Sequence, residues 1–186
     1  GAQIAEELLQ AGRRVYLSVG RHRRLPRRYR GRDLIWWLAD MRLDQVTPEE
    51  RGPARLGPVI SGAYGGRTID FRNFAADGMI LVGHLEAAQD GVIEIAPGLA
   101  DSLADGDLAF TTFLDIVDEY VKRRGLQLPE EPGARATLPD PPCVTAPLQR
   151  LGEHFVTRLL EFRRAHQVVA HLRDLGLQRL QSLISR

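Results

Sequence analysis

The chain has 186 residues, of which 44% are hydrophobic and 26% are charged, and its formal net charge is +1. These values are typical of a soluble globular protein with one sizeable core, and no apolar run approaches the roughly 20 residues that cross a bilayer. Glu6 and Glu7 interrupt the first apolar segment, which excludes a signal peptide there. The single cysteine, Cys143, excludes a disulfide within the chain. We therefore expect a cytoplasmic protein with no membrane span.

The charge is distributed unevenly along the chain. Residues 1–32 contain nine arginines against two glutamates, a balance of +7, whereas residues 33–125 contain eight basic and sixteen acidic residues, a balance of −8. All nine arginines lie between Arg13 and Arg32, and this window contains no acid. Such a basic window predicts contact with an anionic group.

The first predicted elements are a helix and a buried strand. Apolar residues recur at helical spacing over residues 2–11, and Gly12 follows where a left-handed cap is expected. The next segment, "RVYLSV", is rich in β-branched and aromatic residues and stops at Gly20. This pattern predicts a helix, a tight turn and a strand.

The middle of the chain alternates between helix, loop and strands. Residues 33–43 repeat apolar positions at helical spacing behind a possible N-cap, Asp33. Residues 44–67 are rich in glycine and proline, so we expect little regular structure there. The apolar runs 79–85 and 92–96 predict a pair of strands, joined by the turn-like "AAQDG".

A long helix is predicted from Leu99 to Arg124, because apolar residues recur at helical spacing and three basic residues precede Gly125. Residues 126–147 contain six prolines and predict a linker or edge segment. Residues 148–186 carry a net charge of +4 and are predicted to be helical.

The alternation of helices and strands predicts an α/β fold, and a helix followed by a buried strand is the second half of a βαβ unit. In a dinucleotide-binding unit, the third glycine of a glycine-rich turn opens the helix. If Gly1 is that glycine, the first strand and the first two glycines are missing from this chain. We therefore predict a partial Rossmann-type domain over residues 1–147, followed by a helical tail over residues 148–186.

The end of the second strand indicates which cofactor such a domain would prefer. An acid there accepts hydrogen bonds from the ribose of NAD, whereas an arginine binds the 2′-phosphate of NADP. This chain has no acid at that point, and it offers Ser18, Gly20, Arg21, His22, Arg23 and Arg24. One or two arginines suffice, because a guanidinium binds phosphate through two parallel hydrogen bonds. The pattern favours NADP over NAD.

A basic arm that binds nucleic-acid phosphates is the alternative interpretation. The segment "GRHRRLPRRYRGR" has the charge for it and one interleaved aromatic residue, Tyr29. Pro26 and Gly31 interrupt the segment where a recognition helix would have to run. On this interpretation the protein is a non-catalytic interaction module.

Three separated segments carry a resemblance to a known family: "GAQIAEELLQAGRRVYLSVGRHRRLPRRYRGRDLIWWL", "FRNFAADGMILVGHLEAAQDGVIEIAPGLADSLADGD" and "PDPPCVT". Together they resemble the NADPH-binding portion of bacterial flavin-containing monooxygenase-like flavoproteins. Members are often catalogued as flavoproteins involved in potassium transport, and they are related to the class B flavoprotein monooxygenases. The resemblance covers residues 1–147.

The resemblance implies an oxidoreductase that holds FAD in one Rossmann-type domain and NADPH in another. NADPH reduces the flavin, which then oxygenates a small-molecule substrate, and the cofactors carry the chemistry. The resemblance matches Gly1 to the last glycine of the second glycine-rich turn, with Ala2 and Gln3 opening the helix that faces the pyrophosphate.

The same resemblance implies roles for residues after the second strand. It matches Arg21 to the arginine that binds the 2′-phosphate of NADP and His22 to the polar residue beside it. Arg23 or Arg24 is expected to assist.

The sequence also departs from the family. The FAD-binding glycine-rich motif of the family and its "ATG" tripeptide do not occur, and residues 148–186 differ from the expected continuation. We therefore expect no FAD site and no catalysis by the isolated chain, and no catalytic residue is assigned. His154, His166 and His171 lack the spacing of a helical metal pair, so no metal site is predicted.

Overall fold

The computed structural model of this chain describes residues 1–43 and 58–152. It confirms a mixed α/β fold, with small sheets and one long helix. The described residues divide into two compact units, one formed by residues 1–43, 58–84 and 96–148 and the other by residues 85–95 and 149–152.

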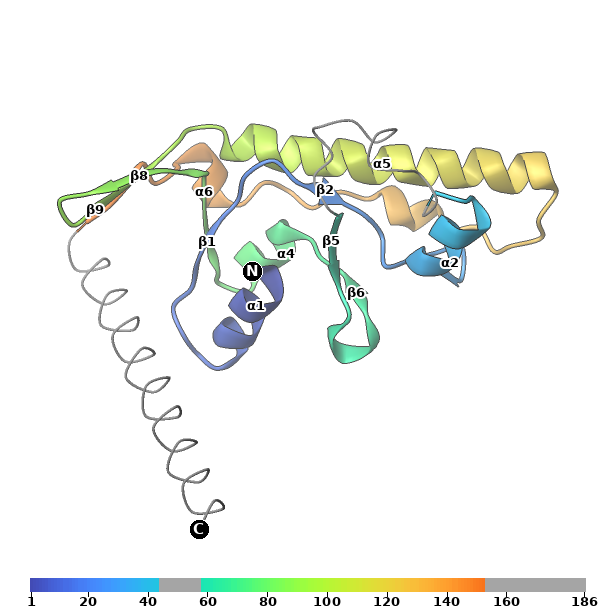
Figure 1. The fold of residues 1–186 in the computed structure, drawn as a ribbon, viewed down its shortest axis with the longest axis horizontal. Coiled ribbons are helices and arrows are strands. Elements are labelled where there is room, and N and C mark those ends of the chain that lie inside the picture. The colour runs from blue at the N-terminus through green and yellow to red at the C-terminus, as the bar shows by residue number, and fades with distance from the viewer. Residues whose placement is uncertain (44–57, 153–186) are drawn as a thin grey trace, which may run out of the picture. The chain divides into compact units, whose positions relative to one another are not determined.

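The elements of the described residues are labelled in Figure 1, which also colours the chain from its N-terminus. The helices are α1 (Ala2–Gln10), α2 (Leu34–Asp40), α4 (Phe71–Ala76), α5 (Leu99–Arg124) and α6 (Pro142–Thr145), with 3-10 turns η1 (Ala63–Gly65) and η2 (Pro132–Arg135). The strands are β1 (Tyr16–Ser18), β2 (Arg23–Arg24), β3 (Arg28–Tyr29), β4 (Arg32–Asp33), β5 (Pro58–Ser61), β6 (Arg67–Thr68), β7 (Ile80–Val82), β8 (Leu85–Gln89), β9 (Val92–Ile95) and β10 (Arg150–Leu151).

The strands form separate small sheets. These are β1 with β7, β2 with β5 and β6, β3 with β4, and β8 with β9 and β10. A Rossmann-type domain requires one continuous parallel sheet. The described residues contain parallel pairs but not such a sheet.

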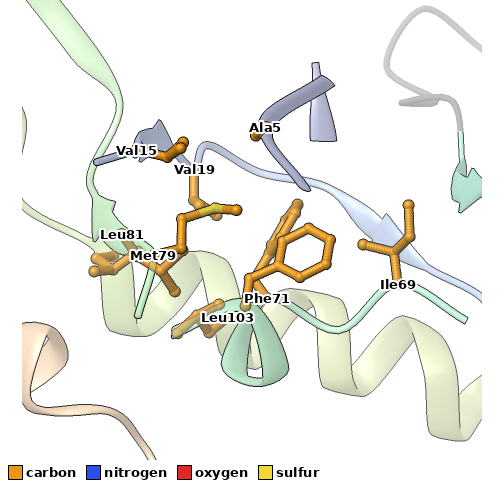
Figure 2. Close-up of a cluster of buried hydrophobic side chains, with 10 residues drawn as sticks. Ala5, Val15, Val19, Ile69, Phe71, Met79, Leu81 and Leu103 are labelled. Atoms are coloured by element: carbon orange, nitrogen blue, oxygen red, sulfur yellow. The ribbon is translucent and has the colours of Figure 1, made fainter. Parts of the chain in front are cut away.

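The parallel pair of β1 and β7 lies in the first hydrophobic core. Tyr16 pairs with Ile80, and Ser18 pairs with Val82. Parallel strands are stable when apolar residues cover them. Figure 2 shows the buried side chains that meet there, which come from α1, α4, α5 and both strand regions: Ala5, Val15, Val19, Ile69, Phe71, Phe74, Met79, Leu81, Leu99 and Leu103.

α1 runs antiparallel to β1, because only a short turn joins them. Gly12 in this turn has φ of 73°, a left-handed conformation that glycine adopts without strain. Ala5 and Leu9 pack against the first core beside Val15. The short turn at Gly12 thus connects α1 to β1, as Figure 1 shows, and β1 pairs in parallel with β7.

α5 forms as predicted because its buried positions recur every three or four residues. Phe110, Phe113, Leu114, Val117 and Val121 are buried on one face. The helix ends at a left-handed glycine preceded by three basic residues, a favourable C-terminus. It spans 26 residues and contributes to both hydrophobic cores of the first unit.

The second hydrophobic core holds α2 and the β3–β4 hairpin against α5. Trp37 is fully buried there, and its indole Nε1 donates a hydrogen bond to the carbonyl of Tyr29 at 3.0 Å. The buried members of this core are Leu25, Tyr29, Leu34, Trp37, Phe110, Phe113, Leu114, Val117 and Val121. As predicted, Asp33 caps α2, accepting a hydrogen bond from the amide of Ile35 at 3.0 Å.

The predicted pairing of residues 79–85 with residues 92–96 is wrong. β7 pairs with β1, and β9 instead pairs with β8, which begins at Leu85, the last residue of the first run, and extends into the predicted turn. The turn itself is only Asp90 and Gly91, both with positive φ, as a two-residue hairpin turn requires. An Asp-Gly turn fixes the register so that Ala87 and Ala88 become strand residues.

The predicted loops contain more structure than expected. Residues 44–57 lie outside the described residues, but β5, η1 and β6 occupy residues 58–68. Residues 126–147 contain the single turns η2 and α6. In the predicted helical tail, β10 pairs with β9, and residues 153–186 lie outside the described part.

Candidate functional site

Hydrogen bonds join the carboxyl ends of β1 and β7. The hydroxyl of Ser18 donates to the carbonyl of Gly83 at 3.0 Å. The amide of Val19 donates to the carbonyl of Val82 at 2.8 Å. Ser18 therefore fixes the point at which both strands end, and the predicted site residues after Gly20 begin there.

The N-terminus of α1 carries no side-chain cap. Gly1 occupies the N-cap position, and the first turn contains no acid. The first helical hydrogen bond runs from the amide of Ala5 to the carbonyl of Gly1, at 3.0 Å. The amides of Ala2, Gln3 and Ile4 therefore have no acceptor within the helix. Gly1 and Gln3 are exposed, and a helix N-terminus of this kind attracts anions.

Arg21 extends into solvent. Its side chain is 81% exposed, and its Nε lies 3.3 Å from a carboxylate oxygen of Asp105 on α5. An ion pair at this exposure contributes only about 0.2–1 kcal/mol. Most of the hydrogen-bonding capacity of Arg21 therefore faces solvent.

His22, in contrast, is packed against α4 and α5. Its Nδ1 lies 3.1 Å from the carbonyl of Gly20, so Nδ1 carries the proton and donates. The ring centre lies 4.7 Å from that of Phe71, and a Cβ on Gly106 would lie 2.5 Å from Nε2. Burial lowers the pKa of His22 below 6.5, although the Gly20 hydrogen bond acts in the opposite direction.

β2 places Arg23 and Arg24 in different surroundings. Arg23 is half-buried, whereas the side chain of Arg24 is only 8% exposed. The guanidinium of Arg24 pairs with Asp70 and, at 3.1 Å, with Asp107. It also lies 4.2 Å from the ring centre of Phe110. Side chains of the protein itself therefore bind the guanidinium of Arg24.

The Arg24 pairs belong to a buried ionic cluster. Arg72 on α4 lies 2.9 Å from Asp107 and 2.8 Å from Asp140. Asp70 also accepts a hydrogen bond from the amide of Arg72 at 2.9 Å and so caps α4. Because Asp140 belongs to the proline-rich segment, the cluster ties that segment, α4 and β2 to α5.

Further arginines of the basic window also have carboxylate partners. Arg27 lies 2.9 Å from Asp33, and Arg30 lies 2.6 Å from Asp118. Both side chains are largely buried, at 22% and 15% exposure. Arg24, Arg27 and Arg30 of the basic window are thus paired internally with acids of the stretch that follows it.

Asp118 is the hub of one such group. It accepts hydrogen bonds from the hydroxyl of Tyr29 at 2.8 Å, from Arg30 at 2.6 Å and from Arg135 at 2.8 Å. Burial acts to raise the pKa of Asp118, but these hydrogen bonds outweigh it and lower the pKa below 3.8. The group fixes the β3–β4 hairpin and the η2 turn to α5.

The second glycine-rich segment, "GAYGGR", does not form an open cradle. Gly66 has φ of 82°, and the side chain of Arg27 packs against the position where a Cβ would stand. A phosphate would therefore have to displace Arg27 from Asp33. The segment offers no site for a second dinucleotide.

Sequence reasoning did not find two residues that lie beside the predicted site. His84 follows β7, and its Nδ1 would be 3.5 Å from a Cβ on Gly20. Parallel pairing of β1 with β7 brings these residues together, whereas the predicted pairing did not. Asp105 meets Arg21 because α5 packs against β2, a contact that carries no local sequence signal.

Other kinds of site were sought among the described residues. No group of three or more histidine, cysteine or acidic side chains there is arranged to hold a metal ion. His154, His166 and His171 lie outside these residues. The helices described include none with the length and apolarity needed to span a membrane.

A shallow hollow of about 430 Å³ includes no predicted site residue, and it is lined by Met41, Leu43, Asp115, Ile116, Glu119, Tyr120 and Arg123.

Two features among these residues are of the kind that anions attract: the uncapped amides at the N-terminus of α1 and the exposed guanidinium of Arg21 after β1. Comparison of the chain with models of protein families, with curated proteins and with solved structures found no match. The family resemblance therefore stays a prediction from the sequence.

Proposed function

We propose that residues 1–147 form the NADPH-binding portion of an FAD-dependent oxidoreductase or monooxygenase. The observation that carries the proposal is that the chain has both an uncapped, acid-free helix N-terminus at α1 and an exposed arginine after β1. NADPH calls for both features, because its pyrophosphate and its 2′-phosphate are separate anionic groups. The sequence resemblance supplies the reaction class.

The residues present fit NADPH. The amides of Ala2 and Gln3 would donate to the pyrophosphate, where Gly1 leaves room for its approach. Arg21 would bind the 2′-phosphate. NADPH supplies a hydride when bound, and the protein contributes binding and orientation.

The neighbouring site residues would act indirectly. His22 would set the path of the chain after β1, since its ring is wedged against Phe71 and Gly106. Arg24 would hold β2 on α5 through Asp107. Ser18 ends β1 and Arg23 lies in β2, which belongs to a separate sheet, and these two residues complete the predicted set.

No FAD site is proposed for this chain, because Arg27 packs against Gly66 of "GAYGGR" and the sequence has no further glycine-rich dinucleotide motif. No chemical step on a flavin is assigned to the chain. Nucleic-acid binding is not proposed either. Three arginines of the segment, Arg24, Arg27 and Arg30, are held by carboxylates, and the segment forms β2, β3 and β4 instead of a recognition helix.

The test is a titration of the purified chain with NADP+ and with NAD+ by calorimetry. We expect tighter binding of NADP+, and we expect Arg21→Ala to weaken NADP+ binding about tenfold or more, since a charged hydrogen bond contributes about 1.5–3 kcal/mol. Arg13→Ala is the matched control, because Arg13 is an exposed arginine in the turn at the opposite end of β1. Equal affinities for the two nucleotides, or salt-sensitive binding of DNA without nucleotide preference, would contradict the proposal.

A further inference from the structure

Arg21 differs from the other paired arginines after β1 in how weakly it is held. Its side chain is 81% exposed, and one carboxylate lies 3.3 Å from a single nitrogen. Arg24 is 8% exposed and has two carboxylate partners. A ligand can therefore displace the carboxylate of Asp105 from Arg21 at a small cost in free energy. Displacing the carboxylates of Arg24 would break a buried ionic cluster.

The partner of Arg21 is fixed in position. Asp105 precedes Gly106, on which the ring of His22 packs, and Asp107 on the other side of Gly106 pairs with Arg24. The segment Asp105–Asp107 of α5 is thus anchored at two adjacent residues. Asp105, itself about half exposed, is held beside the Nε of Arg21.

We propose that Asp105 is a specificity-determining residue of the dinucleotide site, whose carboxylate competes with the 2′-phosphate for Arg21. The inference rests on the proposed function. A phosphate monoester carries a charge of about −1.5 to −2 and three acceptor oxygens, so it replaces a single carboxylate on a guanidinium. The remaining carboxylate then repels the phosphate at short range. NAD+ carries a hydroxyl at this position and leaves the ion pair in place.

Asp105 therefore reduces the preference for NADP+ that Arg21 creates. Removing its charge leaves Arg21 without a competitor and removes the repulsion. An exposed pair contributes about 0.2–1 kcal/mol, which corresponds to an increase of about 1.4-fold to fivefold in affinity for NADP+. Affinity for NAD+ does not change on this account.

The experiment compares NADP+ and NAD+ binding to the full chain and to Asp105→Asn by calorimetry at low ionic strength. Asp101→Asn is the matched control, because it removes the same charge one helical turn earlier on α5. We expect Asp105→Asn to bind NADP+ about 1.4-fold to fivefold more tightly, with NAD+ binding unchanged. Asp101→Asn should leave the ratio of the two affinities unchanged. In an Arg21→Ala background, Asp105→Asn should raise the affinity for NADP+ less than it does in the wild-type chain, because there is no ion pair left to release.

The outcomes separate the two proposals. A wild-type chain without preference for NADP+ overturns the proposed function and this inference together. A preference for NADP+ that Arg21→Ala abolishes but Asp105→Asn leaves unchanged overturns only the inference. An equal gain in affinity for NADP+ and NAD+ in Asp105→Asn also overturns the inference. Such a gain would be a general effect of the lost charge and would not depend on the 2′-phosphate.

Discussion

Gly106 lies in the middle of α5, where the ring of His22 takes the space that a side chain would need. We predict that Gly106→Ala lowers the free energy of unfolding by about 1–2 kcal/mol, although alanine is the better helix former. The reason is that His22 is wedged against Phe71 and has little room to move. Denaturant unfolding measures the effect.

Two variants make this prediction specific. Gly133→Ala is the control, because a Cβ at Gly133 would meet no atom within 4 Å, and its stability should change little. Combining Gly106→Ala with His22→Ala should cost at least about 0.5 kcal/mol less than the sum of the single losses, since the two residues are in contact. Additive losses would show that the contact is not the cause.

His22 also makes stability depend on pH. Burial lowers its pKa in the folded protein below the unfolded value of 6.5. Its contribution to stability is therefore fully present above pH 6.5 and is lost as the pH falls toward the folded pKa, because the unfolded chain binds the proton first. Unfolding free energies between pH 7.5 and about 5 should decline, and His22→Gln should reduce the decline. An identical decline in that variant would contradict the assignment.

At the scale of elements, Asp118 determines how the β3–β4 hairpin and the η2 turn attach to α5. We predict that Asp118→Asn lowers the free energy of unfolding by about 2–3 kcal/mol, because Arg30 and Arg135 lose a charged acceptor. Hydrogen exchange should increase in both attached segments. Since the pKa of Asp118 is lowered, its contribution should persist at mildly acidic pH and be lost as the pH falls through that pKa, below 3.8.

Asp115 offers the matched control for this prediction. It also pairs with Arg135, at 2.7 Å, but its side chain is 67% exposed. Asp115→Asn should therefore lower the unfolding free energy by less than about 1 kcal/mol. Equal losses for the two variants would mean that Asp118 is not the hub.

The long helices and the first strand could be predicted from periodicity and caps, because those signals are local. α1, β1, α2 and α5 lie close to their predicted ranges. The partner of β7 could not be predicted in this way, since an apolar run does not specify which strand it pairs with. A closer interpretation of Asp90 and Gly91 as a two-residue turn would have assigned β8 correctly.

The candidate site was predictable only in part. The arginines after β1 were identified from their position, but the sequence does not distinguish exposed Arg21 from buried Arg24. That difference comes from Asp70 and Asp107, which lie far along the chain. Whether a charged side chain is buried depends on the residues that pair with it in the folded chain. The sequence of the basic window does not show which residues those are.

At the scale of the whole chain, the charge asymmetry has a structural explanation in part. Arg24, Arg27 and Arg30 pair with acids that follow residue 32, so part of the basic charge is balanced inside the first unit. The other exposed arginines of the basic window are Arg13, Arg14, Arg28 and Arg32, beside Arg21, which pairs with Asp105.

The most direct test of the central claim is the backbone amide NMR spectrum of the purified chain, recorded with saturating NADP+ and with NAD+. The account predicts that both nucleotides shift the amides of Ala2 and Gln3, where the pyrophosphate would bind, and that only NADP+ shifts Arg21 and its neighbour His22. Shifts confined to the hollow around Met41 and Tyr120, or no shifts with either nucleotide, would contradict it.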